Sequence, residues 1–219
     1  FSPRDSHKYQ HRILAAGALV LTPAGHSGLY TGMNANFEQP MLSQSFHLRH
    51  AILSDLGEIE RLIALSARAL SASDYSPAQI EGALRGAFGV DTQLIRDETY
   101  FVVGHGAQLV GCGGWSRRRT LFGGDARTGR DATELNPQTE AAKIRAFFIH
   151  PDFARRGIGA TLLDRCEQDA RACGFSRFEM MATLPGVRLY AARGYVAGEP
   201  ILWPLGDGLT ISFVPMRKP

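Results

Sequence analysis

Residues 144–160, with the sequence IRAFFIHPDFARRGIGA, carry the side chains whose types and spacing best fit a chemical role. An apolar run ends at His150 and Pro151, and a helical pattern begins after two arginines and a glycine. The first amides of a helix have no partners inside it, and the helix dipole adds positive potential there. This turn from strand to helix therefore predicts a site for an anion such as a phosphate or pyrophosphate.

Gly157 and Gly159 would let a ligand approach the main chain closely, and Arg155 and Arg156 add positive charge at the rim. The same residues also fit a helix that merely begins at a glycine and has a solvated basic end. On spacing alone, both interpretations stay open.

The elements around this turn follow alternating patterns of strand and helix. Strands are expected at residues 46–52, 99–103, 108–115, 143–149, 177–182, 195–196 and 209–214. Helices are expected at residues 55–70, 77–88, 91–96, 157–173 and 187–193. This order predicts an α/β domain with a mixed sheet.

Three local patterns sharpen this outline. Ser54 or Asp55 can cap the first helix, and Glu58 would complete a capping box from Asp55. Ser76 before Pro77 opens the second helix. Glycines at positions 111, 113 and 114 predict a bulge or a close backbone approach in their strand.

The cysteines are three in number and scattered, at positions 112, 166 and 173. Such a set is neither a disulfide framework nor a zinc site, and we predict no metal site. Cys166 and Cys173 lie seven residues apart on one predicted helix, so they are expected to share a buried face. These features favour a reducing compartment, and we predict a cytoplasmic protein.

Residues 117–139 form a long excursion between two strands, with five arginines, three glycines and a proline. Loops of this length are functional or disordered. The arginines either attract an acidic substrate or face solvent without a role. Trp115 and Phe122 near this loop are candidates for an acceptor pocket or for core packing.

Length and composition fit one soluble domain, with 219 residues of which 44% are hydrophobic. A net charge of +3 does not require a nucleic acid, and no apolar run is long enough to span a membrane. A basic stretch at residues 8–12 before an apolar one at residues 13–21 is similar to a short signal peptide. We interpret residues 1–40 as a poorly ordered tail, a cloning remnant or an over-extended gene model, with secretion as the alternative. The domain then covers residues 41–219.

The glycine turn resembles the acetyl-CoA-binding motif of the GCN5-related N-acetyltransferases (GNAT). That motif is Arg or Gln, two free residues, Gly, a free residue, then Gly or Ala. Residues 157–159 match its core, and residues 149–151 resemble the end of the strand before it. Ala154 departs from the motif, because the family often has Arg or Gln there.

Residues 189–195, LYAARGY, resemble the family's tyrosine-bearing helix, although Thr183 stands where the family often has Asn. The resemblance covers about residues 46–216. It implies a single GNAT-like α/β domain with a central mixed, mostly antiparallel sheet flanked by helices. It also implies that the strand before the motif bends away from its neighbour.

The resemblance implies an N-acetyltransferase that moves an acetyl group from acetyl-CoA to a primary amine of a small molecule or peptide by direct attack. Cofactor contacts are then expected at Phe147, Phe148, Ile149, Arg155, Arg156, Gly157, Ile158, Gly159 and Ala160. An amide near Phe148 or Ile149 would polarise the acetyl carbonyl.

Tyr190 matches the family's general acid by position and would protonate the departing thiolate. Glu140 and Glu179 are candidates for the general base, and a water chain is equally compatible. Without the resemblance, Tyr190 fits a packing residue, and both glutamates fit ordinary solvated carboxylates.

Two other classes of protein compete with an acetyltransferase. A non-catalytic acyl-CoA-binding or sensing module would keep Gly157 and Gly159 but would not need Tyr190. A nucleotide-phosphate binder of another fold is disfavoured, because the chain has no Gly-Lys-Ser/Thr run of the P-loop kind. We expect no nucleic acid or membrane partner, and the family analogy suggests a homodimer.

Overall fold

The computed structural model describes residues 45–219, so the expectations for residues 1–40 lie outside the described part. The strands are β1 (His47–His50), β2 (Tyr100–His105), β3 (Gln108–Ser116), β4 (Ala142–Ile149), β5 (Phe178–Thr183), β6 (Val196–Ala197), β7 (Ile201–Gly206) and β8 (Leu209–Lys218). The helices are α1 (Leu56–Leu70), α2 (Pro77–Leu84), α3 (Thr92–Arg96), α4 (Ile158–Ala172) and α5 (Val187–Ala191). None of these helices has the length and apolar character needed to cross a membrane.

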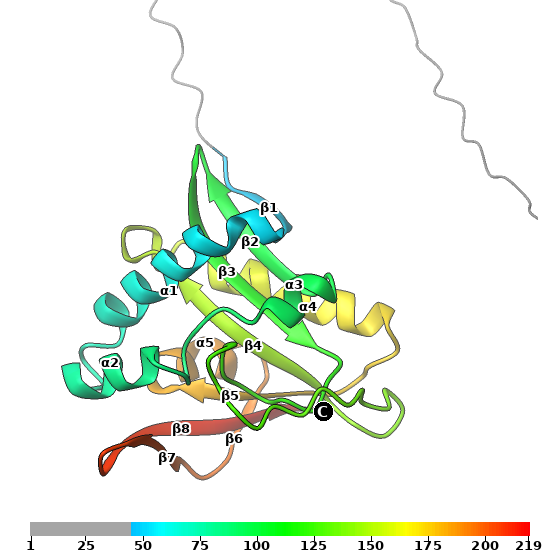
Figure 1. The fold of residues 1–219 in the computed structure, drawn as a ribbon. Helices are drawn as coiled ribbons and strands as arrows, with labels where there is room; N and C mark the ends of the chain where they lie inside the picture. The colour runs from blue at the N-terminus through cyan, green and yellow to red at the C-terminus, as the bar shows by residue number, and fades with distance from the viewer. Residues whose placement is uncertain (1–44) are drawn as a thin grey trace, which may run out of the picture. The chain divides into compact units, whose positions relative to one another are not determined.

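All the strands belong to one sheet, in the order β1-β2-β3-β4-β5-β8-β6 with β7 also beside β8 (Figure 1). Only β4 and β5 run parallel, and every other pair is antiparallel. The predicted mixed, mostly antiparallel sheet in a single α/β domain is thereby confirmed.

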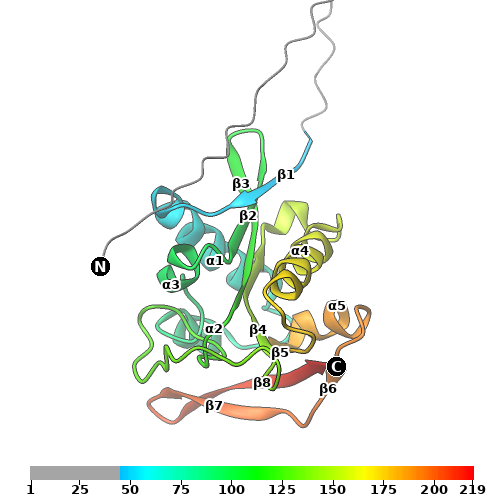
Figure 2. The ribbon, with the colours of Figure 1, turned by 90° about the vertical axis from the view of Figure 1, so that its right-hand side faces the viewer.

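Helices cover both faces of the sheet, with α1 to α3 on one face and α4 and α5 on the other (Figure 2). The side chains of alternate residues of β2 point to opposite faces of the sheet, as strand geometry requires. Phe101 and Val103 join the core beneath α4, and Tyr100 and Val102 join the core beneath α1. The sheet is therefore a buried layer between two apolar cores.

The start of α1 differs from the predicted capping box. A 3-10 turn, Leu53–Asp55, precedes the helix, and the Asp55 side chain does not cap it. Asp55 instead pairs with Arg49 at 2.7 Å and accepts a hydrogen bond from the Ile52 amide. Glu58 accepts a hydrogen bond from the Leu109 amide at 2.7 Å. The capping box is wrong because both carboxylates have partners from neighbouring strands.

Other local predictions had mixed outcomes. Ser76 caps α2 as expected, by accepting a hydrogen bond from the Gln79 amide. Cys166 is buried, but Cys173 is exposed, because the helix ends there and Cys173 is its C-cap residue. Strand β7 was not predicted, since Pro204 interrupts its pattern, yet proline is tolerated in a strand at the edge of a sheet.

Candidate active site

The parallel strands β4 and β5 are paired only at one end. Their register holds at Ala142–Phe178 and Lys143–Glu179, and beyond these positions the two strands separate. On its other side, β4 stays paired with β3 as far as Ile149. The C-terminal half of β4 therefore has one open edge, as the divergence implied by the family resemblance requires.

A β-bulge bends β4 where the strands part. The β3–β4 register shifts between Cys112 and Gly114, and Ala146 has a φ of 56°. The Ala146 carbonyl accepts hydrogen bonds from the Tyr100 hydroxyl at 3.2 Å and from the Cys112 thiol at 3.9 Å. Opposite the bulge, a Cβ on Gly113 would lie only 2.8 Å from the Phe147 ring. Buried partners and a glycine thus hold the bend that the glycine pattern predicted.

Successive amides of β4 point alternately to its two edges, so one hydrogen bond of known direction shows which edge each amide faces. The His150 amide donates to the Val110 carbonyl next to β3, so the Phe148 amide also faces β3. The Ile149 amide faces the other edge, where it donates to the hydroxyl of buried Ser66 on α1 at 3.1 Å. A ligand that uses the Ile149 amide must therefore share it with Ser66 or displace the hydroxyl.

The start of α4 has the geometry of an anion site. Gly157 is the N-cap with a φ of 84°, and no side chain caps the helix. Within residues 45–219, the amides of residues 156–160 donate no hydrogen bond to another protein group. A Cβ built on Gly157 meets no atom within 4 Å, so this side of the turn is open. Free amides at an open helix N-terminus can bind a phosphate or diphosphate.

Arg155 and Arg156 border this turn, and both are exposed. Neither forms an ion pair within the described part of the chain. The Arg156 guanidinium lies 5.1 Å from the centroid of the Phe153 ring. Both side chains are therefore available to a bound anion.

Tyr190 on α5 connects the bulge with the start of α4. Its ring packs edge-on against Phe147, with 6.2 Å between the ring centroids. The adjacent Leu189 reaches Gly159, where an added Cβ would lie 3.0 Å from the leucine side chain. Burial raises the pKa of Tyr190 above its usual value. Its hydroxyl therefore stays protonated at neutral pH and can act as a proton donor.

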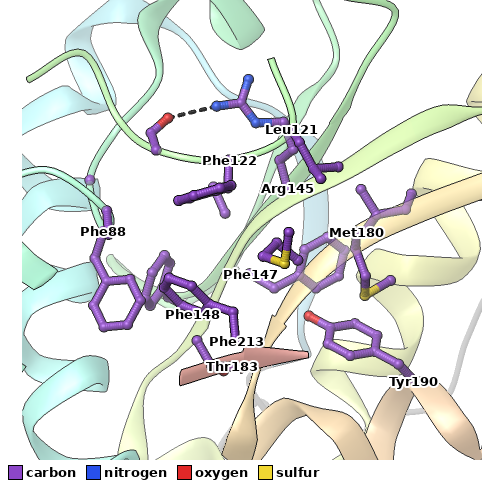
Figure 3. Close-up of a pocket in the computed structure, with 16 residues that line it drawn as sticks. Phe88, Leu121, Phe122, Arg145, Phe147, Phe148, Met180, Thr183, Tyr190 and Phe213 are labelled. Atoms are coloured by element: carbon purple, nitrogen blue, oxygen red, sulfur yellow. Dashed lines mark hydrogen bonds between the residues drawn. The ribbon is translucent and has the colours of Figure 1, made fainter. Parts of the chain in front are cut away.

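A cavity opens between the diverging strands, with Tyr190 at one end (Figure 3). Its other wall is aromatic. The Phe88 ring lies 5.7 Å from that of Phe148 and 6.2 Å from that of Phe213, and Phe122 lies 5.4 Å from Phe213. The cavity thus extends from the proton donor, past the open edge of β4, to a chamber that is lined by aromatic rings and by Arg145.

A family model described as the Acetyltransferase (GNAT) family matches residues 65–195, more than half of the chain. The chain belongs to the GNAT acetyltransferase family. No curated protein matches it closely enough to add a more specific relationship.

Solved structures of GNAT proteins share this fold at low sequence identity. A GCN5-related N-acetyltransferase from Rhodopseudomonas palustris is 21% identical, with a TM-score of 0.58 over 81% of this chain and 98% of that one. PaiA N-acetyltransferase from Thermoplasma acidophilum, solved with coenzyme A, is 16% identical, with a TM-score of 0.53 over 80% and 98%. A putative acetyltransferase from Salmonella typhimurium, solved with its cofactor acetyl-CoA, is 15% identical, with a TM-score of 0.53 over 79% and 92%.

The GNAT fold brings Tyr190 to the cavity but neither of the predicted carboxylates. Glu140 pairs with Arg119 at 2.9 Å and accepts a hydrogen bond from the Asn136 amide. Glu179 pairs with Lys143 and with Arg217. Neither glutamate lines the cavity, whose described lining contains no carboxylate. A base role for Glu140 stays a prediction, and a water chain is the alternative.

Sequence reasoning missed two residues of this GNAT site and left a third open. Ser66 and Arg145 carry no recognisable signal, because each is defined by a partner distant in the chain. The sequence left open whether Phe122 lines a pocket or packs in the core, and the structure places it in the lining of the cavity. Trp115 is fully buried and donates to Asp169 at 2.8 Å, so it is a core residue.

Proposed function

We propose that this GNAT protein is an N-acetyltransferase that transfers the acetyl group of acetyl-CoA to a primary amine of a small molecule or peptide by direct attack. The observation that carries the proposal is the position of Tyr190, at the end of a cavity that opens along the free edge of β4. The structures with coenzyme A and acetyl-CoA favour acetyl-CoA as the donor. The free cysteines of the described part favour a reducing compartment such as the cytoplasm.

Two backbone features would hold the donor. The amides of residues 156–160, with Arg155 and Arg156 beside them, would bind its diphosphate. The open edge of β4 at residues 147–149 would bind its extended arm as an added strand does. Bound there, acetyl-CoA supplies an activated acetyl thioester.

Protein groups then donate a proton to the sulfur and help to remove one from the amine. As the new carbon–nitrogen bond forms and the carbon–sulfur bond breaks, Tyr190 gives its proton to the sulfur. The amine must lose a proton, and a free alkyl ammonium has a pKa of about 10.4. The described lining of the cavity contains the guanidinium of Arg145 and no carboxylate, so it disfavours the charged ammonium and helps the amine to react as the neutral base. Glu140 or a water chain would carry the proton away.

The deciding experiment measures coenzyme A release over a panel of amines, with the wild-type protein and Tyr190→Phe. We expect turnover to fall by about 10²-fold or more, because the proton donor is lost. Acetyl-CoA affinity, measured by calorimetry, should be unchanged. Tyr195→Phe is the matched control, since that ring lies 6.1 Å from Tyr190 but does not line the cavity.

Two outcomes would contradict the proposal. Full turnover in Tyr190→Phe would remove Tyr190 from the chemistry. Tight acetyl-CoA binding with no release of coenzyme A for any amine would identify the non-catalytic acyl-CoA-binding module instead.

A further inference from the structure

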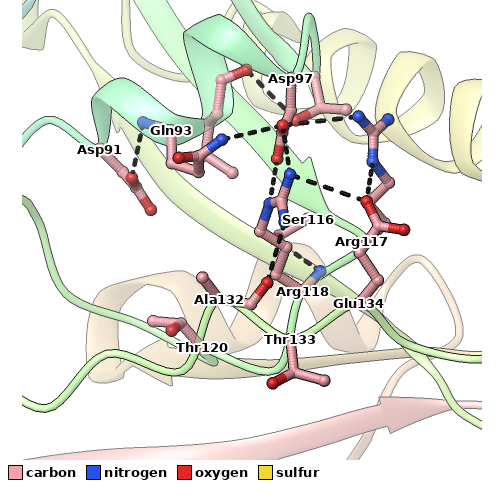
Figure 4. Close-up of polar contacts among 12 residues, drawn as sticks. Asp91, Gln93, Asp97, Ser116, Arg117, Arg118, Thr120, Ala132, Thr133 and Glu134 are labelled. Atoms are coloured by element: carbon pink, nitrogen blue, oxygen red, sulfur yellow. Dashed lines mark hydrogen bonds and ion pairs between the residues drawn. The ribbon is translucent and has the colours of Figure 1, made fainter.

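The arginines of residues 117–139 are not equivalent in the structure. Four of the five pair with carboxylates, and Figure 4 shows two of these, Arg117 and Arg118. The pairs are Arg117 with Asp97 and Glu134, Arg118 with Asp97 and Glu134, Arg119 with Glu140, and Arg130 with Asp91 and Asp125. Carboxylates of the protein thus already balance the charge of these four side chains.

Arg127 is the exception. Within residues 45–219 it has no carboxylate at ion-pair distance, although it is half-buried. Its guanidinium carbon lies 4.4 Å from the Phe122 ring centroid and 4.9 Å from that of Trp203. It also donates a hydrogen bond to the Phe122 carbonyl at 2.5 Å. Burial, with a smaller contribution from Arg130, lowers the pKa of Arg127. A partly desolvated cation without a counter-ion is costly, and an anionic ligand would offset that cost.

Phe122 connects this cation with the cavity. Its ring belongs to the aromatic wall, and Arg127 packs on the same ring. Arg127 does not itself line the cavity and is one aromatic ring away from the chamber that faces Tyr190. The cation of the lining, Arg145, is already paired with Asp91. The described lining offers no carboxylate that could hold a second ammonium group, so the chamber does not suit a polyamine.

We propose that the acceptor is a primary amine with an aromatic body and a carboxylate, and that Arg127 binds this carboxylate. The amine would lie toward Tyr190, and the body would pack against Phe88, Phe148 and Phe213. Guanidinium groups bind carboxylates through paired hydrogen bonds, and aromatic rings beside the pair exclude water. This inference rests on the proposed function and specifies the substrate class for the same site.

The test uses two amines of the same shape, 4-(aminomethyl)benzoate and 4-(aminomethyl)benzamide. For the wild-type protein we expect kcat/KM for the benzoate to be about tenfold higher or more, because only it offers Arg127 a charged partner. The ratio should shrink as salt is added. In Arg127→Gln the ratio should fall to near one, because the ratio cancels any effect of the substitution on the aromatic wall that both amines share. Arg96→Gln is the matched control, because Arg96 is an exposed arginine outside this cavity and has no ion pair among the described residues.

Equal kcat/KM for the two amines in the wild-type protein would overturn the inference, as would a preference that survives in Arg127→Gln. If Arg127→Gln does not fold, the same ratio of kcat/KM is measured in Arg127→Lys. The salt dependence of the wild-type ratio is then the second test. Release of coenzyme A only with amines that lack a carboxylate would support acetyl transfer but contradict the proposed carboxylate of the acceptor. No release with any amine would reject the proposed function itself.

Discussion

At the scale of single residues, Gly157 decides whether the start of α4 can receive an anion. Its φ of 84° lies in the left-handed region, and its Cα faces open space. In Gly157→Ala, the backbone strain should lower the free energy of unfolding by about 1–2 kcal/mol. The added methyl group would occupy the approach of the diphosphate. We therefore expect the Kd of acetyl-CoA to rise about tenfold, or about 1.4 kcal/mol.

The chain provides a control with the same backbone cost. Gly206 has a φ of 93° and also has no atom within 4 Å of an added Cβ, but it lies at the end of β7. Gly206→Ala should lose similar stability in urea unfolding and keep its affinity in calorimetry. Equal loss of affinity in both variants would show that Gly157 acts through stability alone.

At the scale of elements, a buried ion pair attaches the loop of residues 117–139 to α3 and β4. Arg145 on β4 pairs with Asp91 at 2.6 Å and donates to the Gly123 carbonyl at 2.6 Å. Arg130 of the loop pairs with the same carboxylate. The side chains of Arg145 and Asp91 are only 3% and 1% exposed, so solvent cannot replace the partner.

Asp91→Asn tests this attachment. Asparagine can keep the cap on α3, where Asp91 accepts a hydrogen bond from the Gln93 amide, but it removes the charge. Buried Arg145 then loses its carboxylate partner, whereas Arg130 keeps Asp125. We expect the free energy of unfolding to fall by about 3–5 kcal/mol. Urea unfolding measures the loss, and limited proteolysis should show earlier cleavage within the loop.

An exposed ion pair provides the comparison. Arg68 and Glu81 join α1 and α2 at 2.6 Å, with side chains that are 56% and 49% exposed. Glu81→Gln should change stability little, because water screens the pair. A loss as large as that of Asp91→Asn would show that charge removal in general, rather than burial, sets the effect.

At the scale of the whole domain, the gap between β4 and β5 couples ligand binding to the free energy of unfolding. The strands share only two register positions, and a donor along the open edge would add contacts to both. At a concentration of acetyl-CoA 100 times its Kd, we expect a gain of about 2.7 kcal/mol in the free energy of unfolding. Thermal unfolding with and without the ligand measures the gain.

Hydrogen exchange locates the same effect. Acetyl-CoA should slow exchange at the amides of residues 156–160, where free donors acquire partners. It should also cover the open edge of β4, where the Ile149 amide already has Ser66 as its partner. The turn between β7 and β8, away from the cavity, is the internal control. Protection there without protection at residues 156–160 would place the ligand elsewhere.

The sequence by itself determined most elements and the start of α4. Periodicity placed α1 through to Leu70, and the glycine turn placed the beginning of α4. These features are local, because helical spacing and backbone conformation depend on residues close together in the chain. The role of the tyrosine of α5 was predicted only through a short motif that resembles the GNAT family, because its spacing alone fits a packing residue.

Only the tertiary structure decided which groups remain free. Ser66 accepts a hydrogen bond from the Ile149 amide across 83 positions of the chain, and Asp55 turns to Arg49 instead of its own helix. Four arginines of the long loop are neutralised, which leaves Arg127 beside the aromatic wall. Spacing along the chain cannot show such pairings, because they arise when folding brings distant charges and hydrogen-bonding groups within a few ångströms of each other.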